Sequence, residues 1–301
     1  MNTLVIVTGP TAVGKTGAAI QIAQTLGCEI INADSRQVYA DIPIATALPT
    51  AGQRAAVPHH LMAFLPLEQT YSAWQFEHDA LALLPELWQR GNGFAVVVGG
   101  SMMYVDALRF GIDPMPDIRP DIRQAVLDQI ESEGLDNLLE ELRRRDPEYH
   151  AIVDRANPRR VAHAIEICRQ TGSTYTSLRT GTARQRPFRI ITLALNLPRD
   201  VLFDRINCRV LQMIDLGLED EARGVYPMRQ LNALNTVGLK EMFAHFDGRL
   251  SRDEAIARIQ KNTRVYAKKQ LTWLRRDNTL HYATPDQALP AVQTLVSEDA
   301  P

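Results

Sequence analysis

The chain has 301 residues, is 45% hydrophobic and carries a formal net charge of −2 at pH 7. This length and composition fit a globular protein that has one domain with an inserted or appended segment. No apolar run approaches the roughly 18 residues that a membrane span needs. Because the first predicted strand begins near residue 3, we expect no signal peptide and a cytoplasmic protein. Three widely spaced cysteines favour neither a disulfide framework nor a zinc site, and we expect buried thiols.

A strand, a glycine-rich loop and a helix open the chain, in the stretch LVIVTGPTAVGKTGAAIQIAQTLG of residues 4–27. Residues 4–7 predict a buried strand, and residues 16–26 predict a helix that ends in a left-handed cap at Gly27. Between them lies the spacing of a phosphate-binding loop, whose backbone N–H groups point at an anion, with a lysine for the outer phosphate oxygens and a hydroxyl for magnesium. We therefore predict a phosphate site formed by Gly9, Pro10, Thr11, Ala12, Val13, Gly14, Lys15 and Thr16.

Three later apolar segments, 28–35, 94–101 and 189–197, predict further strands of one sheet. Helical stretches separate these strands in the sequence. That alternation indicates an α/β fold like that of P-loop NTPases, with a three-layer, mostly parallel sheet.

The region 114–187 carries no strand signal and reads as helical, with helices expected at 121–145 and 157–172. We therefore expect a helical insertion, 114–187, in a core whose first part is 1–113 and whose second part is 188–301. After the insertion, helices are expected from about 201 to 216 and from 251 to 276.

Basic residues gather in two parts of the chain despite the balanced net charge. Residues 143–189 hold eleven arginines against four acidic residues, and 258–276 hold seven basic residues and no acidic one. The second cluster falls on a predicted helix that opens with a capping box, Ser251 to Glu254. A narrow basic sector of this helix lies beside an apolar sector, the first made of Lys261, Arg264, Lys268 and Arg275 and the second of Ile256, Ile259, Tyr266 and Leu274. Such a stripe fits a polyanionic partner, and a solvated helix face is the alternative.

Asp34, at the end of the second predicted strand, is the candidate base. The guanine-binding pattern Asn-Lys-x-Asp is absent and the third strand ends in VVVGGS without an acid, which disfavours GTPases and motor-type ATPases. Ligands of open α/β sheets bind at the carboxyl ends of the strands, so Asp34, Ser101 and the phosphate loop should converge. A small-molecule kinase fits this pattern, while a turn carboxylate is the alternative for Asp34. For His59 and His60 we predict packing and not metal binding.

Seven motifs occur in one order along the chain: GPTAVGKT, NADSRQVY, PHHL, YSAWQF, VGGSMMY, NPRRVAHAIE and YAKKQLTWLR. In this combination, from about residue 4 to 276, the chain resembles the tRNA dimethylallyltransferase (IPP transferase) family. The resemblance implies transfer of a dimethylallyl group from dimethylallyl diphosphate to N6 of the adenosine immediately 3′ of the anticodon. The loop then holds the donor diphosphate, magnesium neutralises it, and the catalytic residues are Lys15, Thr16 and Asp34, with Asp34 accepting the N6 proton.

The resemblance also implies that the tRNA anticodon stem-loop is a partner, for a protein expected to act as a monomer. The residues implied to contact the tRNA are Asp34, Ser35, Arg36, Gln37, Ser101, Arg123, Asn157, Pro158, Arg159, Arg160, Val161, Asn235, Gly238, Lys240, Lys261, Arg264, Lys268, Lys269, Gln270, Trp273 and Arg275.

The chain departs from the family pattern at Ala45, Leu48, His163 and Leu239, where relatives usually have a glycine, a lysine, an arginine and an aromatic residue. We expect these changes to weaken tRNA binding and to lower activity while the chemistry remains. Three other functions stay open: a small-molecule kinase that uses ATP, an isopentenyltransferase acting on free adenylate, and an RNA-binding protein without turnover.

Overall fold

The computed structural model describes residues 1–181 and 183–298. The chain divides into two compact units, one made of Met1–Phe110 with the chain from Gln185 onward, and one made of Gly111–Arg184. The expected insertion, 114–187, starts and ends about three residues later than the second unit. Each unit is described by itself below.

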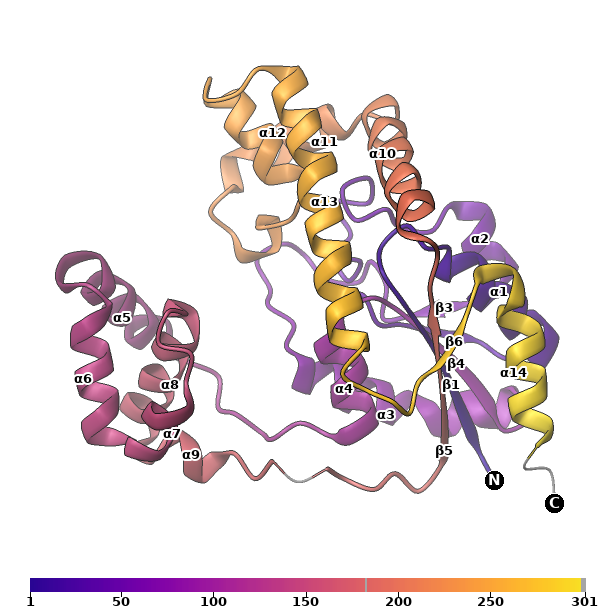
Figure 1. The fold of residues 1–301 in the computed structure, drawn as a ribbon, viewed down its shortest axis with the longest axis horizontal. Coiled ribbons are helices and arrows are strands. Elements are labelled where there is room, and N and C mark those ends of the chain that lie inside the picture. Colours follow the sequence, from indigo (N-terminus) through magenta and orange to yellow (C-terminus); the bar gives the residue numbers. More distant parts are fainter. Residues whose placement is uncertain (182, 299–301) are drawn as a thin grey trace. The chain divides into compact units, whose positions relative to one another are not determined.

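The first unit contains a six-stranded sheet in the order β3-β2-β4-β1-β5-β6, and every strand pairing in it is parallel (Figure 1). The predicted parallel α/β fold is therefore confirmed. The two edge strands, of two and three residues, were not predicted because segments that short carry no alternation pattern. The strands are β1 (Thr3–Thr8), β2 (Ile30–Asn32), β3 (His59–His60), β4 (Phe94–Val98), β5 (Arg189–Leu195) and β6 (His281–Ala283).

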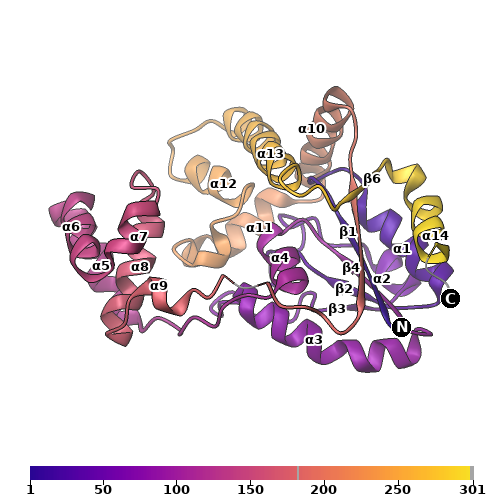
Figure 2. The same ribbon diagram turned by 60° about the horizontal axis from the view of Figure 1, so that its bottom comes forward.

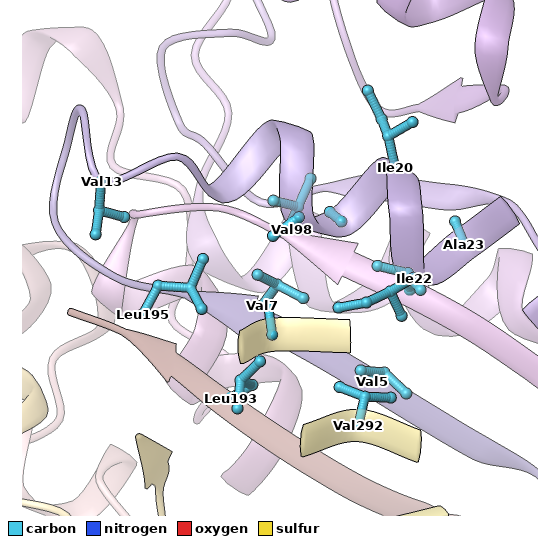
Figure 3. Packing of buried hydrophobic residues seen from close by; sticks show 14 of the residues in the cluster. Val5, Val7, Val13, Ile20, Ile22, Ala23, Val98, Leu193, Leu195 and Val292 are labelled. Atoms are coloured by element: carbon cyan, nitrogen blue, oxygen red, sulfur yellow. The ribbon is translucent and has the colours of Figure 1, made fainter. Parts of the chain in front are cut away.

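The central strand β1 is buried on both faces. Val5 and Val7 pack with helix α1 (Lys15–Leu26) and helix α14 (Ala288–Ser297), and Figure 3 shows them among Ile22, Leu193 and Val292. The alternate residues of β1 face the other layer. A fully buried aliphatic side chain contributes about 1.5–3 kcal/mol, so this strand fixes the position of the loop that follows it.

Two layers of helices cover the sheet, and a group of helices from the second half of the chain adds a further hydrophobic cluster (Figures 1 and 2). The remaining elements of this unit are α2 (Ala51–Ala56), α3 (Ala73–Arg90), α4 (Met102–Phe110), α10 (Arg199–Asp215), α11 (Leu218–Val225), α12 (Leu239–Phe246), α13 (Arg252–Leu274) and the short 3-10 helices η1 (Tyr226–Met228), η2 (Asn232–Leu234) and η3 (Pro285–Gln287).

Helix ends follow the local sequence signals. Helix α1 ends at Gly27, whose φ of 64° and N–H bonds to the Ala23 and Gln24 carbonyls confirm the predicted left-handed cap. Helix α13 begins at Ser251, and the predicted capping box with Glu254 is present.

The second unit is helical, with α5 (Pro120–Glu133), α6 (Leu135–Arg145), α7 (Pro147–Ile152), α8 (Pro158–Thr171) and α9 (Tyr175–Leu178). Its core contains Val126, Leu138, Leu142, Val161 and Ile165. The stretch 121–145 is helical as expected, and Gly134, with φ 83°, divides it into two helices. No helix in the described part of the chain is long and apolar enough to cross a membrane.

Two of the three cysteines are buried, Cys28 and Cys168, but Cys208 is exposed on α10. The expectation of three buried thiols was therefore wrong for Cys208, which falls on the solvent side of an amphipathic helix. Burial raises the pKa of Cys28 to about 12 and also raises that of Cys168.

We expect iodoacetamide to alkylate Cys208 alone in the folded protein near neutral pH. The thiolate is the reactive species. Of the three cysteines, Cys28 and Cys168 are buried and Cys208 is exposed to the reagent. Peptide mass mapping before and after denaturation measures this, with Cys208→Ser as the unlabelled control. Alkylation of Cys28 in the native protein would contradict the burial described here.

Candidate functional site

The phosphate loop joins β1 to α1 and depends on two glycines. Gly9 has φ 147°, and a Cβ there would lie 2.7 Å from the carbonyl oxygen of Leu195. Gly14 has φ 108° and is the residue before the helix. Both positions therefore require glycine, and the loop follows the carboxyl end of β1, the end of the strands at which open α/β sheets bind ligands.

Lys15 lies inside this loop. Its Nζ donates to the carbonyl oxygens of Gly9 at 3.0 Å and Pro10 at 2.8 Å. Desolvation lowers its pKa to about 8, the Asp34 carboxylate acts in the opposite direction, and the Arg209 guanidinium lowers it further. Lys15, Asp34 and Arg209 are thus close enough to form one electrostatic site.

Two arginines of α10 lie against the loop. Arg205 Nη1 donates to the carbonyl oxygen of Val13 at 3.3 Å, and Arg209 Nη2 donates to the Thr11 hydroxyl. The Nε of Arg209 is buried and has no hydrogen-bond partner in the part of the chain described. A buried N–H without an acceptor is costly, so this atom fits an absent anion. Sequence reasoning missed both arginines, although their spacing of four residues places them on one helix face.

Gln270 of α13 connects the loop to the end of β4. It is 2% exposed, its Oε1 accepts from the Thr11 N–H at 2.8 Å, and its Nε2 donates to the Gly100 carbonyl at 2.9 Å. A Cβ on Gly100 would lie 2.5 Å from that Nε2, so the close approach needs glycine. Gln270 was predicted to contact tRNA, and the structure places its side chain in the interior of the site.

Asp34 and Ser101 converge at the carboxyl ends of neighbouring strands. Asp34 Oδ1 accepts from the Arg36 N–H at 2.9 Å, the turn interaction that was the structural alternative for this residue. The Ser35 N–H donates to Ser101 Oγ at 2.7 Å, and that hydroxyl donates to Ser35 Oγ at 3.0 Å. The turn fixes one carboxylate oxygen, and the Asp34 carboxylate raises the pKa of Lys15 against the larger effect of desolvation.

The next two predicted tRNA contacts are already engaged with protein. Arg36 Nη1 donates to the Asn232 and Ala233 carbonyls at 3.1 and 3.3 Å. Gln37 Nε2 donates to the carbonyls of Thr46 and Ala47 at 3.1 and 3.0 Å. These bonds hold the segment after Asp34 against η2 and the loop at 43–48.

Glu221 fixes that loop from α11. Its two carboxylate oxygens accept from the N–H groups of Ile44 and Ala45, each at 2.7 Å. Leu48, where relatives usually have lysine, lines a cavity of about 310 Å³ that Arg209 and Arg54 also line. The loop at 43–48 therefore lines this cavity next to Arg209, and Leu48 adds no positive charge to the cavity wall.

Two residues of the predicted basic stripe on α13 interact with side chains of α10. Arg264 Nη1 donates to Asn207 Oδ1, and Lys268 Nζ lies 5.5 Å from the ring of Phe203. The remaining predicted contacts with exposed charges on this helix are Lys261, Lys269 and Arg275. Tyr266, expected in the buried sector, is 39% exposed instead, and desolvation of its hydroxyl, with Asp34 nearby, raises its pKa to about 12.

Three other predicted contacts lie before or within α12. Gly238 has φ 104° and its N–H donates to Glu241 Oε2 at 2.8 Å, so it shapes the start of the helix. Asn235 is half-buried and Lys240 is exposed. Leu239, where the family pattern has an aromatic residue, is completely buried.

In the second unit, Asn157 Oδ1 accepts from the Arg160 N–H at 3.3 Å and caps α8, which begins at Pro158. Val161 is buried in the core of that unit. Arg159 and Arg160 are exposed, and Arg123 Nε lies 3.9 Å from Glu166 Oε1. The three arginines therefore place positive charge on the surface of this unit. Asn157 and Pro158 form the start of α8, and Val161 packs in the core.

Comparison with known proteins adds an independent finding. The chain matches the family model described as IPP transferase over residues 37–277 and the model described as Isopentenyl transferase over residues 2–57. It is 49% identical over 296 residues to "tRNA dimethylallyltransferase 2" of Porphyromonas gingivalis, covering 98% of each chain. It is 50% identical over 298 residues to the protein of the same name from Parabacteroides distasonis, covering 99% of each.

Solved structures agree. The tRNA isopentenylpyrophosphate transferase of Bacillus halodurans matches with a TM-score of 0.72 and 34% identity, covering 99% of this chain and 96% of that one. A eukaryotic dimethylallyltransferase, for which crystallographic snapshots of its action on tRNA exist, matches with a TM-score of 0.82 and 25% identity, covering 100% of this chain and 81% of that one.

Lys15 should make diphosphate affinity depend on pH. A bound anion favours the protonated amine, so the complex has a higher pKa than the value of about 8 in the free protein. Above pH 8, binding therefore takes up a proton and weakens by up to about tenfold per pH unit, until the pH passes the pKa of the complex. Below pH 8, Lys15 is already charged and adds no dependence.

Calorimetry with inorganic diphosphate, in buffers of different ionisation enthalpy, measures this proton uptake. Lys15→Met should bind more weakly and lose the proton that Lys15 takes up, leaving only the titration of diphosphate itself. Equal proton uptake by both proteins would show that Lys15 is not the titrating group.

Proposed function

The chain belongs to the IPP transferase family, and we propose that it transfers a dimethylallyl group from dimethylallyl diphosphate to N6 of the adenosine immediately 3′ of the anticodon in tRNAs. The products are N6-(dimethylallyl)adenosine and diphosphate. One observation carries the proposal: at the carboxyl ends of the strands, the phosphate loop lies with Asp34 and with Arg209, whose buried Nε has no acceptor among the described residues.

The donor diphosphate is held by the loop. Lys15 and the Nε of Arg209 offer donors at this place, together with the loop N–H groups other than those of Thr11 and Val13, which donate to Gln270 and Pro10. When the bond between the allylic carbon and the diphosphate oxygen breaks, the electron pair leaves with the diphosphate. Fixed donors that stabilise the charge developing on those oxygens lower the barrier of this step.

The acceptor loses one proton in the reaction. The N6 lone pair forms the new bond to the allylic carbon, and the resulting alkylated amine gives its proton to an Asp34 oxygen. Alkylation makes that proton acidic, so a carboxylate is a sufficient acceptor. The bond from the Arg36 N–H to Oδ1 orients the carboxylate for this role.

Magnesium fits the donor set at the loop. The Thr16 hydroxyl has no hydrogen-bond partner among the residues that the structure describes, and no group of three or more His, Cys, Asp and Glu gathers there to hold a metal by itself. Magnesium bound with few protein ligands takes the rest from phosphate and water. In this site Thr16 would hold the ion, which supplies positive charge to the diphosphate.

The adenine must leave the anticodon loop stack to reach Asp34, at a cost of a few kcal/mol. Exposed basic side chains offer phosphate contacts that offset this cost: Lys240, Lys261, Lys268, Lys269 and Arg275 in the first unit, and Arg123, Arg159 and Arg160 in the second. Neutral and buried predicted contacts, such as Gln270, act by shaping the site.

Incubation with unmodified tRNA and dimethylallyl diphosphate, followed by mass spectrometry of the nucleosides, tests the proposal. We expect dimethylallyladenosine only when tRNA is the acceptor. Consumption of ATP with a small acceptor would favour the kinase alternative, and prenylation of free adenylate would favour the shorter isopentenyltransferases.

Replacing Asp34 by Asn should lower turnover by about 10²- to 10⁴-fold, the loss typical of a missing general base. The affinity for inorganic diphosphate should stay nearly unchanged, because the loop and Arg209 remain. Single-turnover kinetics and calorimetry measure the two effects. Near-normal turnover by the variant would remove Asp34 from the mechanism.

Replacing Lys261 and Lys268 together by Gln should weaken tRNA binding at every salt concentration. Each lost phosphate contact reduces the slope of log affinity against log salt by about 0.7, which gives a reduction of about 1.4 for the double variant. Arg90→Gln, at the end of α3 and paired with Glu29, is the control of like charge. An unaltered slope would mean that this stripe is a solvated helix face.

A further inference from the structure

The cavity beside Arg209 has no role in the reaction described above. It measures about 310 Å³ and lies between the segment 43–50, the start of α2 and the last turns of α10. Helix α10 lines it with Arg209, Gln212, Met213 and Leu216, whose spacing of three and four residues places them on one helix face. A volume of roughly 300 Å³ is the lower end of the range for pockets that bind small molecules.

The walls of this cavity are mostly hydrocarbon. Among the described residues that line it, none is acidic, and the charged ones are Arg54 and Arg209. Aliphatic side chains come from both sides of the cavity: Ile44, Leu48, Pro49, Met213 and Leu216. Such walls favour a hydrocarbon ligand, because its binding removes apolar surface of both partners from water.

Hydrogen bonds hold the segment 43–50 in place as one wall. Glu221 accepts from two of its N–H groups at 2.7 Å, and Gln37 donates to two of its carbonyl groups at 3.1 and 3.0 Å. On the opposite wall Met213 is 7% exposed, whereas Leu216 is 70% exposed. The cavity is therefore preformed, and it opens to solvent near Leu216.

Arg209 belongs to the cavity and to the phosphate site. Its Nη2 donates to the Thr11 hydroxyl, and its buried Nε has no acceptor among the described residues. The same side chain lines the cavity. A diphosphate that accepts from this guanidinium therefore lies next to the cavity, and a hydrocarbon group esterified to it can extend along α10.

The cavity is longer than a five-carbon group requires. From Arg209 to Leu216 the helix rises about 10 Å. Three bonds of an extended chain span about 3.8 Å, so the main chain of a dimethylallyl group spans about 4 Å and that of a ten-carbon geranyl group, with seven bonds, about 9 Å. A dimethylallyl group therefore leaves the part near Leu216 unfilled, whereas a geranyl group reaches it.

We propose that this cavity binds the hydrocarbon chain of allylic diphosphates longer than dimethylallyl diphosphate, up to about ten carbons, and that the protein transfers such groups to tRNA. The proposal rests on the proposed function, because loop and acceptor are the same. The bond between the allylic carbon and the diphosphate oxygen breaks, and its electron pair leaves with the diphosphate. The N6 lone pair forms the new bond, the N6 proton passes to Asp34, and no further reactant is needed.

Calorimetry without tRNA tests the binding step with inorganic diphosphate, dimethylallyl diphosphate and geranyl diphosphate. Burial of one methylene group raises affinity about fourfold. Partial burial of the added carbons should therefore make geranyl diphosphate bind at least about tenfold more tightly than dimethylallyl diphosphate. Equal affinities for these two ligands would overturn the proposal.

Leu216→Glu should lower the ratio of the two affinities to about threefold or less, because burying the chain beside a carboxylate desolvates a charge. Leu211→Glu is the matched control, since Leu211 is also an exposed leucine of α10 but does not line the cavity. Leu48→Trp, which narrows the cavity, should lower the same ratio. A ratio unchanged in both Leu216→Glu and Leu48→Trp would overturn the proposal.

Incubation of unmodified tRNA with geranyl diphosphate, followed by mass spectrometry of the nucleosides, tests the transfer. We expect geranyladenosine from the wild type and from Leu211→Glu. The ratio of geranyl to dimethylallyl product should fall in Leu216→Glu. Tight binding of geranyl diphosphate without transfer would overturn its role as a donor. Weaker binding of ADP to Leu48→Trp, with an unchanged ratio for the two prenyl ligands, would assign the cavity to a purine ring and overturn the proposal.

The two proposals fail differently. If the proposed function is wrong, neither donor gives a prenylated adenosine in tRNA. If only the cavity proposal is wrong, the wild type transfers the dimethylallyl group and binds geranyl diphosphate no more tightly than dimethylallyl diphosphate.

Discussion

The two hydrogen bonds of the Gln270 amide hold the catalytic site together. One joins α13 to the Thr11 N–H of the phosphate loop, and the other joins it to the Gly100 carbonyl at the end of β4. Since the amide is 2% exposed, both bonds are protected from water and either loss leaves a buried polar group unpaired. Through this side chain, α13 fixes two segments from the first half of the chain: the phosphate loop, which precedes Lys15, and the segment after β4, which precedes Ser101.

The electrostatics of the site favour occupancy by an anion. Lys15 and Arg209 are two cations in a desolvated space, balanced by the single carboxylate of Asp34, and desolvation lowers the pKa of both. Lys15 uses loop carbonyls as acceptors, and the Nε of Arg209 has none in the described residues. A diphosphate gives both groups charged acceptors, so donor binding and stabilisation of the leaving group use the same donors.

Sequence patterns predicted the local parts of this site well and the long-range parts poorly. The phosphate loop, the cap at Gly27 and the capping box at Ser251 are short-range patterns, and each has the expected form. The arginines of α10 carry no motif of their own; only the folding of β5 and α10 against the loop gives them a role. Gln270 lies in a motif associated with tRNA, yet a motif does not distinguish a side chain that touches RNA from one that shapes the site.

The departures from the family pattern differ in their expected effect on the structure and charge of the site. Ala45 replaces a glycine, but its φ is not positive and its N–H bonds to Glu221, so a Cβ there causes no backbone strain. Leu239 is completely buried, where an aliphatic side chain contributes to the core. Leu48 is different, because it faces the cavity that Arg209 and Arg54 line and removes a positive charge from that wall. The anion site itself is built from the loop, Lys15 and Arg209, none of which is a departure, so we expect the chemistry to be retained and any loss to fall on binding.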